Sequence, residues 1–429
     1  MFELTLTALI SIVFMFFINI IKNNRHYFFI SFTFISYSIF PILGYYFYPT
    51  RMNLVSGSQV YSNNVYYLFT SFIFIFLIIF LAITFYYDKR IKINLLDKIE
   101  FQKIEKNKFL LKIFYTLCFL VIIYSCYMII KNFKELDYTT QYILKENKLW
   151  FYIFDFQWLL SFILIVKFKN SNKKFEKNII LLLLAFILLI FLTTSIKAGQ
   201  RLGLVKFLIC IICFYIIKKP FSLTLKNITK FSAISFTILV FLSIIRYTRG
   251  KNLNSINQII ETLGEINFFS FENLIFQDWA IPLMSLSTSI AKELINPLFI
   301  LKTEILTLIP FIERRSLGEW ISRLIDPYGI TGYGYSVITE SYNLFGFAGS
   351  LIGPFIIFFG FKLLFSLFTK TTDVNFNLCI ISLINALTID IVRGSFILFL
   401  KGIYLYFIPF LVTYCLANNY KFTIKWTKN

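Results

Sequence analysis

Long apolar runs are the feature that most constrains what this chain can fold into. About eleven stretches of roughly 20 residues contain almost no charge and are bounded by charged or polar residues. They lie at residues 2–22, 27–48, 65–87, 110–131, 149–168, 178–196, 203–218, 230–247, 344–368, 377–392 and 395–416. Only 15% of the residues are charged and 58% are hydrophobic, which is too apolar for a soluble globule. Helices of this length cross a bilayer, and we predict an all-α, polytopic membrane protein with about eleven spanning helices.

The lysines mark alternate loops and thereby predict the orientation in the membrane. Cytoplasmic loops of membrane proteins concentrate Lys and Arg, and lysine-rich segments alternate here with lysine-poor ones. The segments assigned to the cytoplasm are 22–26, 88–112, 167–178, 218–230, 362–370 and the tail 418–429. The segments assigned to the outside are 49–64, 132–148, 197–203, 247–343 and the turn around Arg393. This placement accounts for much of the net charge of +20 without a nucleic-acid partner.

The first apolar run is predicted to be a retained helix with its N-terminus outside. It lacks the basic start and the small-residue cleavage site of a signal peptide, and Lys22 and Arg25 follow it. The chain then divides into three predicted parts. They are the N-terminal helices 1–246 with about eight spans, the large periplasmic loop 247–343, and residues 344–429 with about three spans and a cytoplasmic tail.

The predicted outer loop has an organisation of its own. Amphipathic runs within 285–315 are interrupted by Pro297 and Pro310, which favours short helices that lie along the membrane interface over spanning helices. A glycine-rich stretch follows and leads into the next span. Its glycines, which allow tight turns and close helix contacts, are Gly329, Gly332, Gly334, Gly346, Gly349 and Gly353.

Cysteine and histidine usage excludes several kinds of site. All six cysteines lie inside apolar runs, and the C-x-x-C formed by Cys210 and Cys213 lacks the exposed, electropositive setting of a redox or metal site. The only histidine, His26, lies in a short charged turn that we assign to the cytoplasm. We therefore expect packing roles for the cysteines, no metal, no cofactor, and neither a His-based metal cluster nor a Ser-His-Asp site.

Arginine is distributed differently from lysine. Only Arg25 and Arg90 fall on the predicted cytoplasmic side, against the usual trend. The arginines on the predicted outer side are Arg51, Arg201, Arg246, Arg249, Arg314, Arg315, Arg323 and Arg393. A guanidinium group binds phosphate or carboxylate through two parallel hydrogen bonds, so an outward-facing anion site is predicted. The alternative for any single arginine is an interfacial anchor or a partner of a nearby glutamate.

With no histidine on the predicted outer side, a general base there would be a carboxylate. Glu340 is the first candidate, because it lies at the start of a span among polar residues that include Ser336, Tyr342 and Asn343. Asp326 and Glu319 are weaker candidates. The alternative for Glu340 is a carboxylate that favours the positive end of a helix dipole. Asp390 lies three residues before Arg393 and is expected to pair with it.

Several short motifs carry a resemblance to a known family. They are the turn AGQRLG after a span, the IRYTRG exit into the long loop, the IPFIERR segment, the stretch GYGYSVITESYNLFGFAG at the start of a span, and the late turn DIVRGSF. In these motifs and in its architecture the chain resembles the oligosaccharide repeat-unit polymerases, the Wzy family, which include the O-antigen and enterobacterial common antigen polymerases. The glycine-rich stretch ending in E-x-Y-N-L-F-G is the most specific of the five.

The resemblance implies a glycosyltransferase of the bacterial inner membrane whose active site faces the periplasm. Its donor and acceptor would be oligosaccharides linked to undecaprenyl diphosphate, with a chain-length regulator and a flippase as partners. Arginines would neutralise the diphosphate leaving group where other enzymes use a metal ion. The residues carried over as diphosphate or glycan contacts are Arg201, Arg249, Arg315 and Arg393. The weaker candidates are Arg246, Arg314, Arg323 and Asp326.

Other function classes compete with this interpretation. A related O-antigen ligase would use a histidine in its outer loop, whereas His26 falls on the other side. A polysaccharide flippase or transporter would place cationic residues within its spans and would not need the long loop 247–343. An ion-coupled transporter would need buried acidic residues, which are scarce in the apolar runs. The sequence therefore favours the polymerase.

Overall fold

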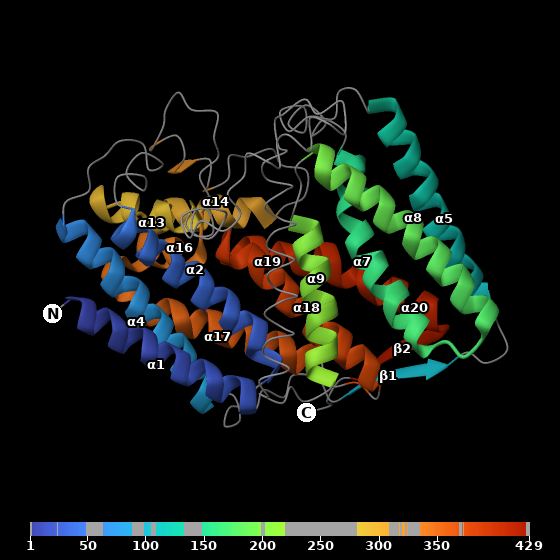
Figure 1. The fold of residues 1–429 in the computed structure, drawn as a ribbon, viewed down its shortest axis with the longest axis horizontal. Coiled ribbons are helices and arrows are strands. Elements are labelled where there is room, and N and C mark those ends of the chain that lie inside the picture. The colour runs from blue at the N-terminus through green and yellow to red at the C-terminus, as the bar shows by residue number, and fades with distance from the viewer. Residues whose placement is uncertain are drawn as a thin grey trace. The chain divides into compact units, whose positions relative to one another are not determined.

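The structure of the chain is a computed structural model, shown as a ribbon in Figure 1. It describes residues 2–23, 25–48, 63–87, 98–103, 109–132, 148–198, 202–218, 281–308, 317, 320–321, 324, 335–368, 371 and 373–425. The chain forms two compact units, each assembled from segments that are distant in the sequence. The first unit comprises 1–95, 269–370 and 380–403, and the second comprises 96–268, 371–379 and 404–429.

The first unit is a bundle of long apolar helices with shorter helices at one end. Its long helices are α1 (Phe2–Asn23), α2 (Phe28–Phe47), α4 (Asn63–Tyr87), α17 (Gly349–Phe368) and the C-terminal part of α18 (Val374–Val392). The shorter helices are α13 (Ile281–Ala291), α14 (Pro297–Leu308), α16 (Val337–Phe345) and α19 (Phe396–Gly402), with single 3-10 turns at Arg25–Tyr27 and Gly346–Ala348. Helix α4 packs against α1, α2, α13 and α17 and is the centre of the bundle.

Aromatic side chains form the core of this first unit. The rings of Phe34 and Phe80, both fully buried, lie 4.7 Å apart between their centroids. A single polar side chain, that of Asn385 in α18, fixes the turn between α1 and α2. Its amide nitrogen donates to the His26 carbonyl at 2.8 Å, and its oxygen accepts from the Ile30 backbone nitrogen at 3.2 Å. These bonds satisfy backbone groups at the start of α2 that have no partner within the helix.

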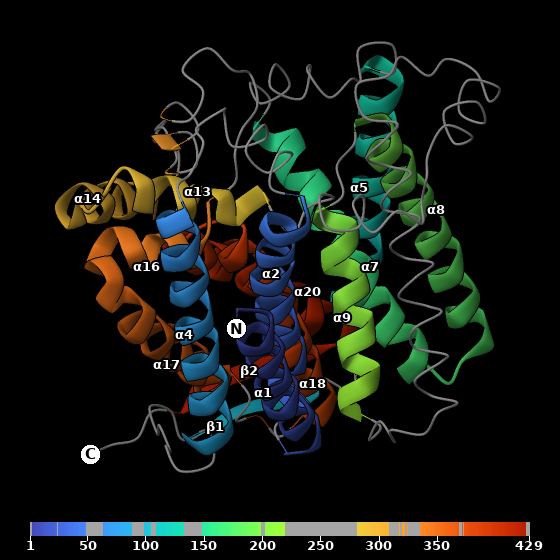
Figure 2. The same cartoon turned by 60° about the vertical axis from the view of Figure 1, so that its left-hand side comes forward.

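Helices α13 and α14 lie across the ends of α2 and α4, as both Figure 1 and Figure 2 show. Pro297 begins α14, where a proline costs no hydrogen bond, and the Asn296 side chain accepts from the Phe299 backbone nitrogen at 3.2 Å. The two short helices match the expectation of amphipathic runs interrupted by Pro297. The C-terminal end of α2 contacts α13 through Tyr45 and Ser287, whereas His26 lies in the turn before the other end of α2, and a helix of this length spans roughly 30 Å.

The second unit consists of a helix bundle and a small sheet. Its helices are α5 (Phe109–Asn132), α7 (Lys148–Asn170), α8 (Lys174–Ala198), α9 (Leu202–Lys218) and α20 (Ile408–Asn418), which follows the π-helical segment Ile403–Phe407. A buried Gln157 on α7 donates to Ser125 on α5 at 2.5 Å. The cysteines Cys210 and Cys213 are buried on α9, as expected for packing residues.

A two-stranded antiparallel sheet was not predicted from the sequence. Strand β1 (Lys98–Lys103) pairs with β2 (Tyr420–Lys425), so that Lys98 lies opposite Lys425 and Phe101 opposite Phe422. The alternation K-I-E-F-Q-K is a strand pattern, but its partner is more than 300 residues away. Both strands lie in segments assigned to the same side of the membrane, and their pairing requires that they share a side.

The helices identify a multi-pass membrane protein. The predicted run 230–247 lies outside the described residues, and most of the others coincide with one helix each. The run 344–368 includes the end of α16 and the turn Gly346–Ala348 before α17, and the run 395–416 comprises α19, the π-helical segment and α20. Within the described part of the chain, seven helices are long and apolar enough to cross a membrane. They are Phe28–Phe47, Asn64–Tyr87, Phe109–Lys131, Lys174–Thr193, Val337–Ser366, Val374–Val392 and Leu400–Asn418. The full count of about eleven, the three-part division and the side that each loop faces stay predictions.

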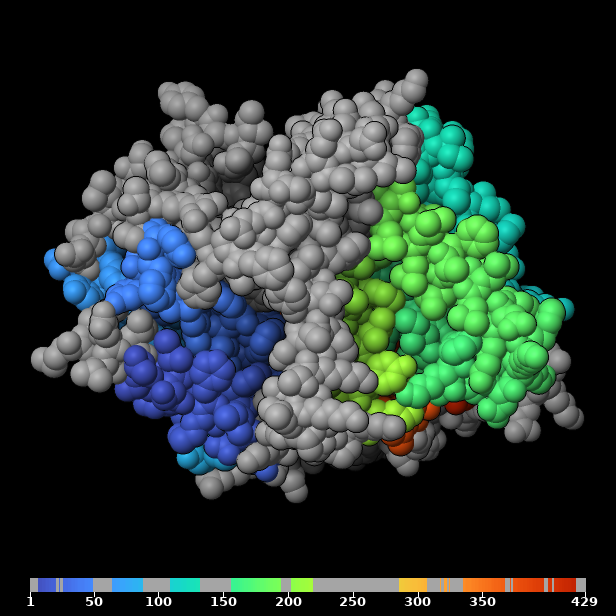
Figure 3. Space-filling model, in the orientation of Figure 1, coloured from blue at the N-terminus to red at the C-terminus, as the bar shows by residue number. Residues whose placement is uncertain are grey.

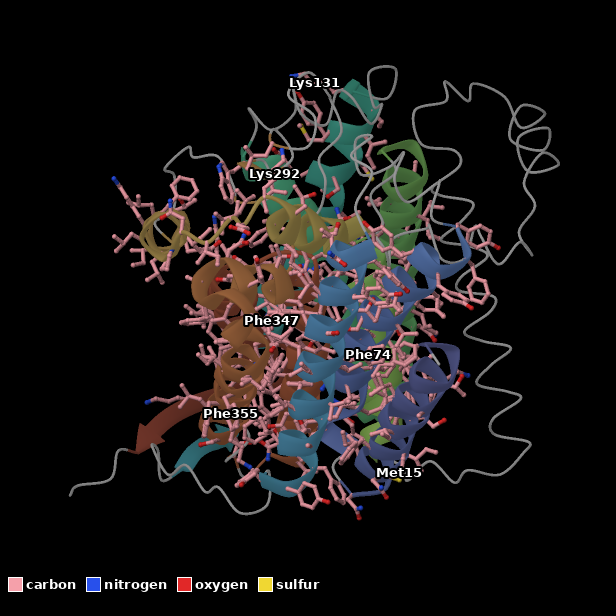
Figure 4. All side chains as sticks on the ribbon, turned by 90° about the vertical axis from the view of Figure 1, so that its left-hand side faces the viewer. Met15, Phe74, Lys131, Lys292, Phe347 and Phe355 are labelled. Atoms are coloured by element: carbon pink, nitrogen blue, oxygen red, sulfur yellow. The ribbon has the colours of Figure 1, made fainter. Side chains whose placement is uncertain are left out.

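Exposed apolar side chains show why these helices need a lipid environment. On α8, Leu182 is 60% exposed and Leu189 is 62% exposed, and the face seen in Figure 3 displays α8 in green beside α5 in teal. In the first unit Phe355 is 44% exposed, whereas Phe74 is buried (Figure 4). Contiguous apolar surface of this kind is unfavourable in water and favourable against acyl chains.

Candidate functional site

The short helix α16, which carries Glu340, begins with a hydrogen-bonded cap. Ser336 is the N-cap residue, and its hydroxyl accepts from the Thr339 backbone nitrogen at 3.2 Å. The Thr339 hydroxyl in turn lies 2.8 Å from the Ser285 hydroxyl on α13. All three residues are fully buried. The cap, which the sequence analysis did not predict, therefore also connects α16 to α13.

Glycines allow α16 to fold back against α17. Gly346 ends α16 with φ +59°, a backbone conformation that favours glycine. A Cβ at Gly349 would collide with the Ser341 carbonyl, and a Cβ at Gly353 would collide with the Ser341 side chain. The sequence F-G-F-A-G-S-L-I-G is thus required for a close helix contact, and that contact holds Glu340 at a defined position.

Glu340 lies at the contact between α16 and the turn that follows α18. Its Oε2 atom accepts a hydrogen bond of 2.8 Å from the Phe396 backbone nitrogen, and the residue is only 5% exposed. Phe396 belongs to the motif DIVRGSF, so the structure brings together two of the motifs that the sequence analysis singled out. Its ring lies against Gly360, where a Cβ would come within 2.7 Å of it.

A second carboxylate, Glu304 on α14, reaches the same turn. Its Oε2 atom accepts from the Ser395 hydroxyl at 2.7 Å, and the residue is 3% exposed. Burial raises the pKa of the Glu304 carboxyl to about 7, although the hydrogen bond from Ser395 acts in the opposite direction. Sequence reasoning missed this residue. The available signal was an isolated acid in the otherwise apolar helix PLFILKTEILTL.

The two carboxylates constitute one buried acidic site, because they bind the consecutive residues Ser395 and Phe396. Two like charges in a low-dielectric site disfavour each other, so such a pair tends to retain one proton near neutral pH. A buried acid that exchanges a proton near neutral pH is the type of group that general acid–base catalysis uses. The site can therefore accept or release a proton at this end of the first unit.

Arg393 lies two residues before Ser395, in the turn that both carboxylates hold. Its backbone nitrogen donates to the Ile389 carbonyl at 2.9 Å, and its side chain is exposed. Asp390, by contrast, is buried with 9% of its surface exposed. An exposed arginine therefore lies two residues before Ser395, the residue that Glu304 binds. The ion pair between Asp390 and Arg393 stays a prediction.

Around Glu340, an apolar cluster fixes the start of α16. Tyr335 packs with Ile300 of α14 and with Leu317 and Ile321, and its hydroxyl accepts a hydrogen bond of 3.3 Å from the Asn343 side chain. Burial first, and then the nearby Glu340 carboxylate, raise the pKa of the Tyr335 phenol. At the end of α13, the Lys292 ammonium (labelled in Figure 4) donates to the Leu324 carbonyl at 2.8 Å.

Several predicted site residues lie outside the described part of the chain. They are Arg51, Arg201, Arg246, Arg249, Arg314, Arg315, Glu319, Arg323 and Asp326. Their proposed roles stay predictions. Among the described residues, the structure places Glu340 and the Arg393 turn together. Within the same residues, no group of three or more His, Cys, Asp or Glu side chains has an arrangement that could hold a metal ion.

Comparison with known proteins does not add to this picture. No family model, curated protein or solved structure matches the chain. The functional conclusion therefore depends on the residues and on their geometry.

Proposed function

We propose that the protein is a glycosyltransferase that polymerises oligosaccharide repeat units linked to undecaprenyl diphosphate. The growing glycan is transferred from its lipid diphosphate to the incoming lipid-linked unit at the periplasmic face of a bacterial inner membrane. The product is a surface polysaccharide of the O-antigen type. This proposal starts from the resemblance of five short motifs to the repeat-unit polymerases, and geometry supports it.

The observation that carries the proposal is the hydrogen bond between Glu340 and the Phe396 backbone nitrogen. It joins the glycine-rich motif, which contains the candidate base, to the DIVRGSF motif, which contains the candidate diphosphate contact Arg393. The two residues that it links are 56 positions apart in the sequence. A transferase with a diphosphate leaving group needs a proton acceptor and a cation near the same reacting atoms.

The chemistry assigned to these residues is a single displacement. The terminal sugar hydroxyl of the incoming unit attacks the anomeric carbon of the growing glycan, and its proton passes to the Glu340 carboxylate. The bond between the anomeric carbon and the diphosphate oxygen breaks, and the undecaprenyl diphosphate leaves with the electron pair. The guanidinium groups of Arg393, Arg201, Arg249 and Arg315 stabilise its charge through paired hydrogen bonds.

Deleting the gene in its native host tests the proposal. A surface glycan that carries one repeat unit on its anchor, in place of a ladder of lengths, is the expected result, because attachment of single units does not require polymerisation. Restoration of the ladder by a plasmid copy completes the test. Complete absence of glycan on the anchor would instead indicate a flippase or a ligase.

The predicted orientation has its own test. Reporter fusions at Asn254, in the predicted outer loop, and at Lys173, between α7 and α8, should report opposite sides of the membrane. The same side for both positions would contradict an outward-facing active site.

A further inference from the structure

Two carboxylates from different helices bind two consecutive residues of one turn. Glu304 of α14 accepts from the Ser395 hydroxyl, and Glu340 of α16 accepts from the Phe396 backbone nitrogen. Both glutamates are more than nine-tenths buried. Removing a carboxylate from water is unfavourable, so an arrangement with two of them at one turn calls for a functional reason.

The turn itself has little intrinsic rigidity. Gly394 separates Arg393 from Ser395, and glycine restricts the backbone less than any other residue. The Gly394 backbone nitrogen donates to the Ile391 carbonyl over a long 3.4 Å. The hydrogen bond from the Phe396 backbone nitrogen to Glu340 restrains the turn at one residue. A second bond to the neighbouring residue fixes its orientation as well as its position.

We propose that Glu304 is a positioning residue that, through Ser395, holds the Arg393 turn in the orientation that the transfer reaction requires. Glu304 thus acts on the diphosphate site without touching the substrate, whereas Glu340 serves both as the second anchor of the turn and as the proton acceptor. This role rests on the proposed function, because it assigns Arg393 to the diphosphate. It extends that function to a residue that neither the motifs nor the resemblance indicated.

A graded series of variants tests the hydrogen bond. Glu304→Gln retains an oxygen that accepts from Ser395, so polymer formation should stay within about threefold of wild type. Glu304→Ala and Ser395→Ala each remove one partner and should each reduce the rate about tenfold. The double variant should be no slower than the slower single variant, since both changes remove the same bond. The rate is measured as ladder formation in membranes of the deletion strain that carry each variant.

A second series asks whether Glu304 acts through Arg393. In an Arg393→Ala background, Glu304→Ala should reduce the remaining rate by less than about twofold, because the group that it positions is already absent. A merely structural role would give the full tenfold loss in both backgrounds. The matched control is Glu293→Gln, a change of an exposed acid in the link between α13 and α14, which should leave the rate unchanged.

The outcomes separate this inference from the proposed function. If gene deletion leaves the ladder intact, the proposed function fails. If deletion abolishes the ladder but Glu304→Ala and Ser395→Ala retain the wild-type rate, or if their losses add to that of Arg393→Ala, the positioning role is wrong. If Glu304→Ala does not accumulate in the membrane, Ser395→Ala and Glu304→Gln still test the positioning role of Glu304. The Ser395 variant must then be slow and the glutamine variant fast for the role to stand.

Discussion

Each compact unit contains glutamate side chains that accept hydrogen bonds, but their partners differ between the units. In the second unit Glu176 on α8 receives hydrogen bonds from Ser171 at 2.7 Å and Tyr115 at 3.2 Å and an ion pair from Lys167 at 3.3 Å. Its negative charge is therefore compensated within the turn between α7 and α8. In the first unit Glu304 and Glu340 share one buried site, where Glu304 accepts from the Ser395 hydroxyl and Glu340 accepts from the Phe396 backbone nitrogen.

Under the proposed function, Glu176 stabilises the fold and Glu340 takes part in the reaction. A glutamate that binds a cation and two hydroxyl groups connects neighbouring helices and contributes to stability. Two buried carboxylates at one turn are unfavourable for stability but are able to hold a proton near neutral pH. Variants in both units test this difference, and the variant expected to lose the most activity comes first.

Exchange of Glu340 for Gln should have the largest effect. Glutamine accepts from Phe396 but cannot take up the proton, so the rate of polymer formation should fall about a hundredfold or more. The matched change, Glu176→Gln, should leave the rate within about twofold and reduce the free energy of unfolding by roughly 1 kcal/mol. Ladder formation measures the rate, and thermal melting of the purified proteins measures the stability. If Glu340→Gln and Glu176→Gln lost the same activity, Glu340 would have no role in the reaction that Glu176 lacks.

The arginine at the turn comes next. Arg393→Lys keeps the charge but loses the paired hydrogen bonds, so its activity should fall nearly as far as that of Arg393→Ala, about a hundredfold in rate. The same is expected of Arg201, Arg249 and Arg315. Arg51, in the first predicted outer loop, should tolerate both changes. Wild-type ladders from all four lysine variants at normal protein levels would leave these arginines as interface anchors.

A glycine pair tests the fold-back of α16. A Cβ at Gly349 collides with backbone of Ser341, so Gly349→Ala should displace Glu340 and reduce the rate about tenfold. At Gly203 in the second unit, a Cβ meets the Phe191 ring at 3.0 Å, and a ring is able to shift. Gly203→Ala should therefore reduce the rate of polymer formation by less than about threefold. If Gly203→Ala reduced activity and Gly349→Ala did not, the close contact of α16 with α17 at Gly349 would not be needed for activity.

The smallest effect concerns stability and pH. The pKa of Glu304 is raised from 4.5 to about 7, so the folded state holds this proton more tightly than the unfolded state does. Its contribution is fully present below about pH 4.5 and is lost as the pH rises towards 7. The melting temperature in detergent should fall by a few degrees between about pH 5 and about pH 8, and less steeply in Glu304→Gln. If the melting temperature changed equally with pH in the wild-type protein and in Glu304→Gln, Glu304 would not be the group that titrates.

Prediction from sequence succeeded where local pattern determines structure. Apolar runs such as 65–87 and 110–131 coincide with α4 and α5, because the length and composition of a spanning helix are properties of its own residues. The close helix contact at Gly349 was expected from the glycines in the same way, because glycine has no Cβ to separate the two helices. Glu340 was identified as a candidate because it lies at the start of a span among polar residues and no histidine lies on the predicted outer side.

The parts that escaped prediction depend on contacts across long sequence separations. The residues of β1 have a strand pattern, but an isolated six-residue strand is not stable, and its partner β2 is more than 300 residues away in the sequence. Glu304 looks like an ordinary residue of an amphipathic helix until α14 lies against α19, 91 residues later.

The sequence by itself determined that this is a helical membrane protein, and it identified the motifs that contain Glu340 and Arg393. Both follow from what single residues prefer: apolar side chains prefer lipid, and glycine permits tight turns. Only the tertiary structure decided that Glu304 joins Glu340 at the turn of Ser395 and Phe396. The proton affinity of a carboxylate depends on burial and on neighbouring charges, and those are fixed by which helices pack together.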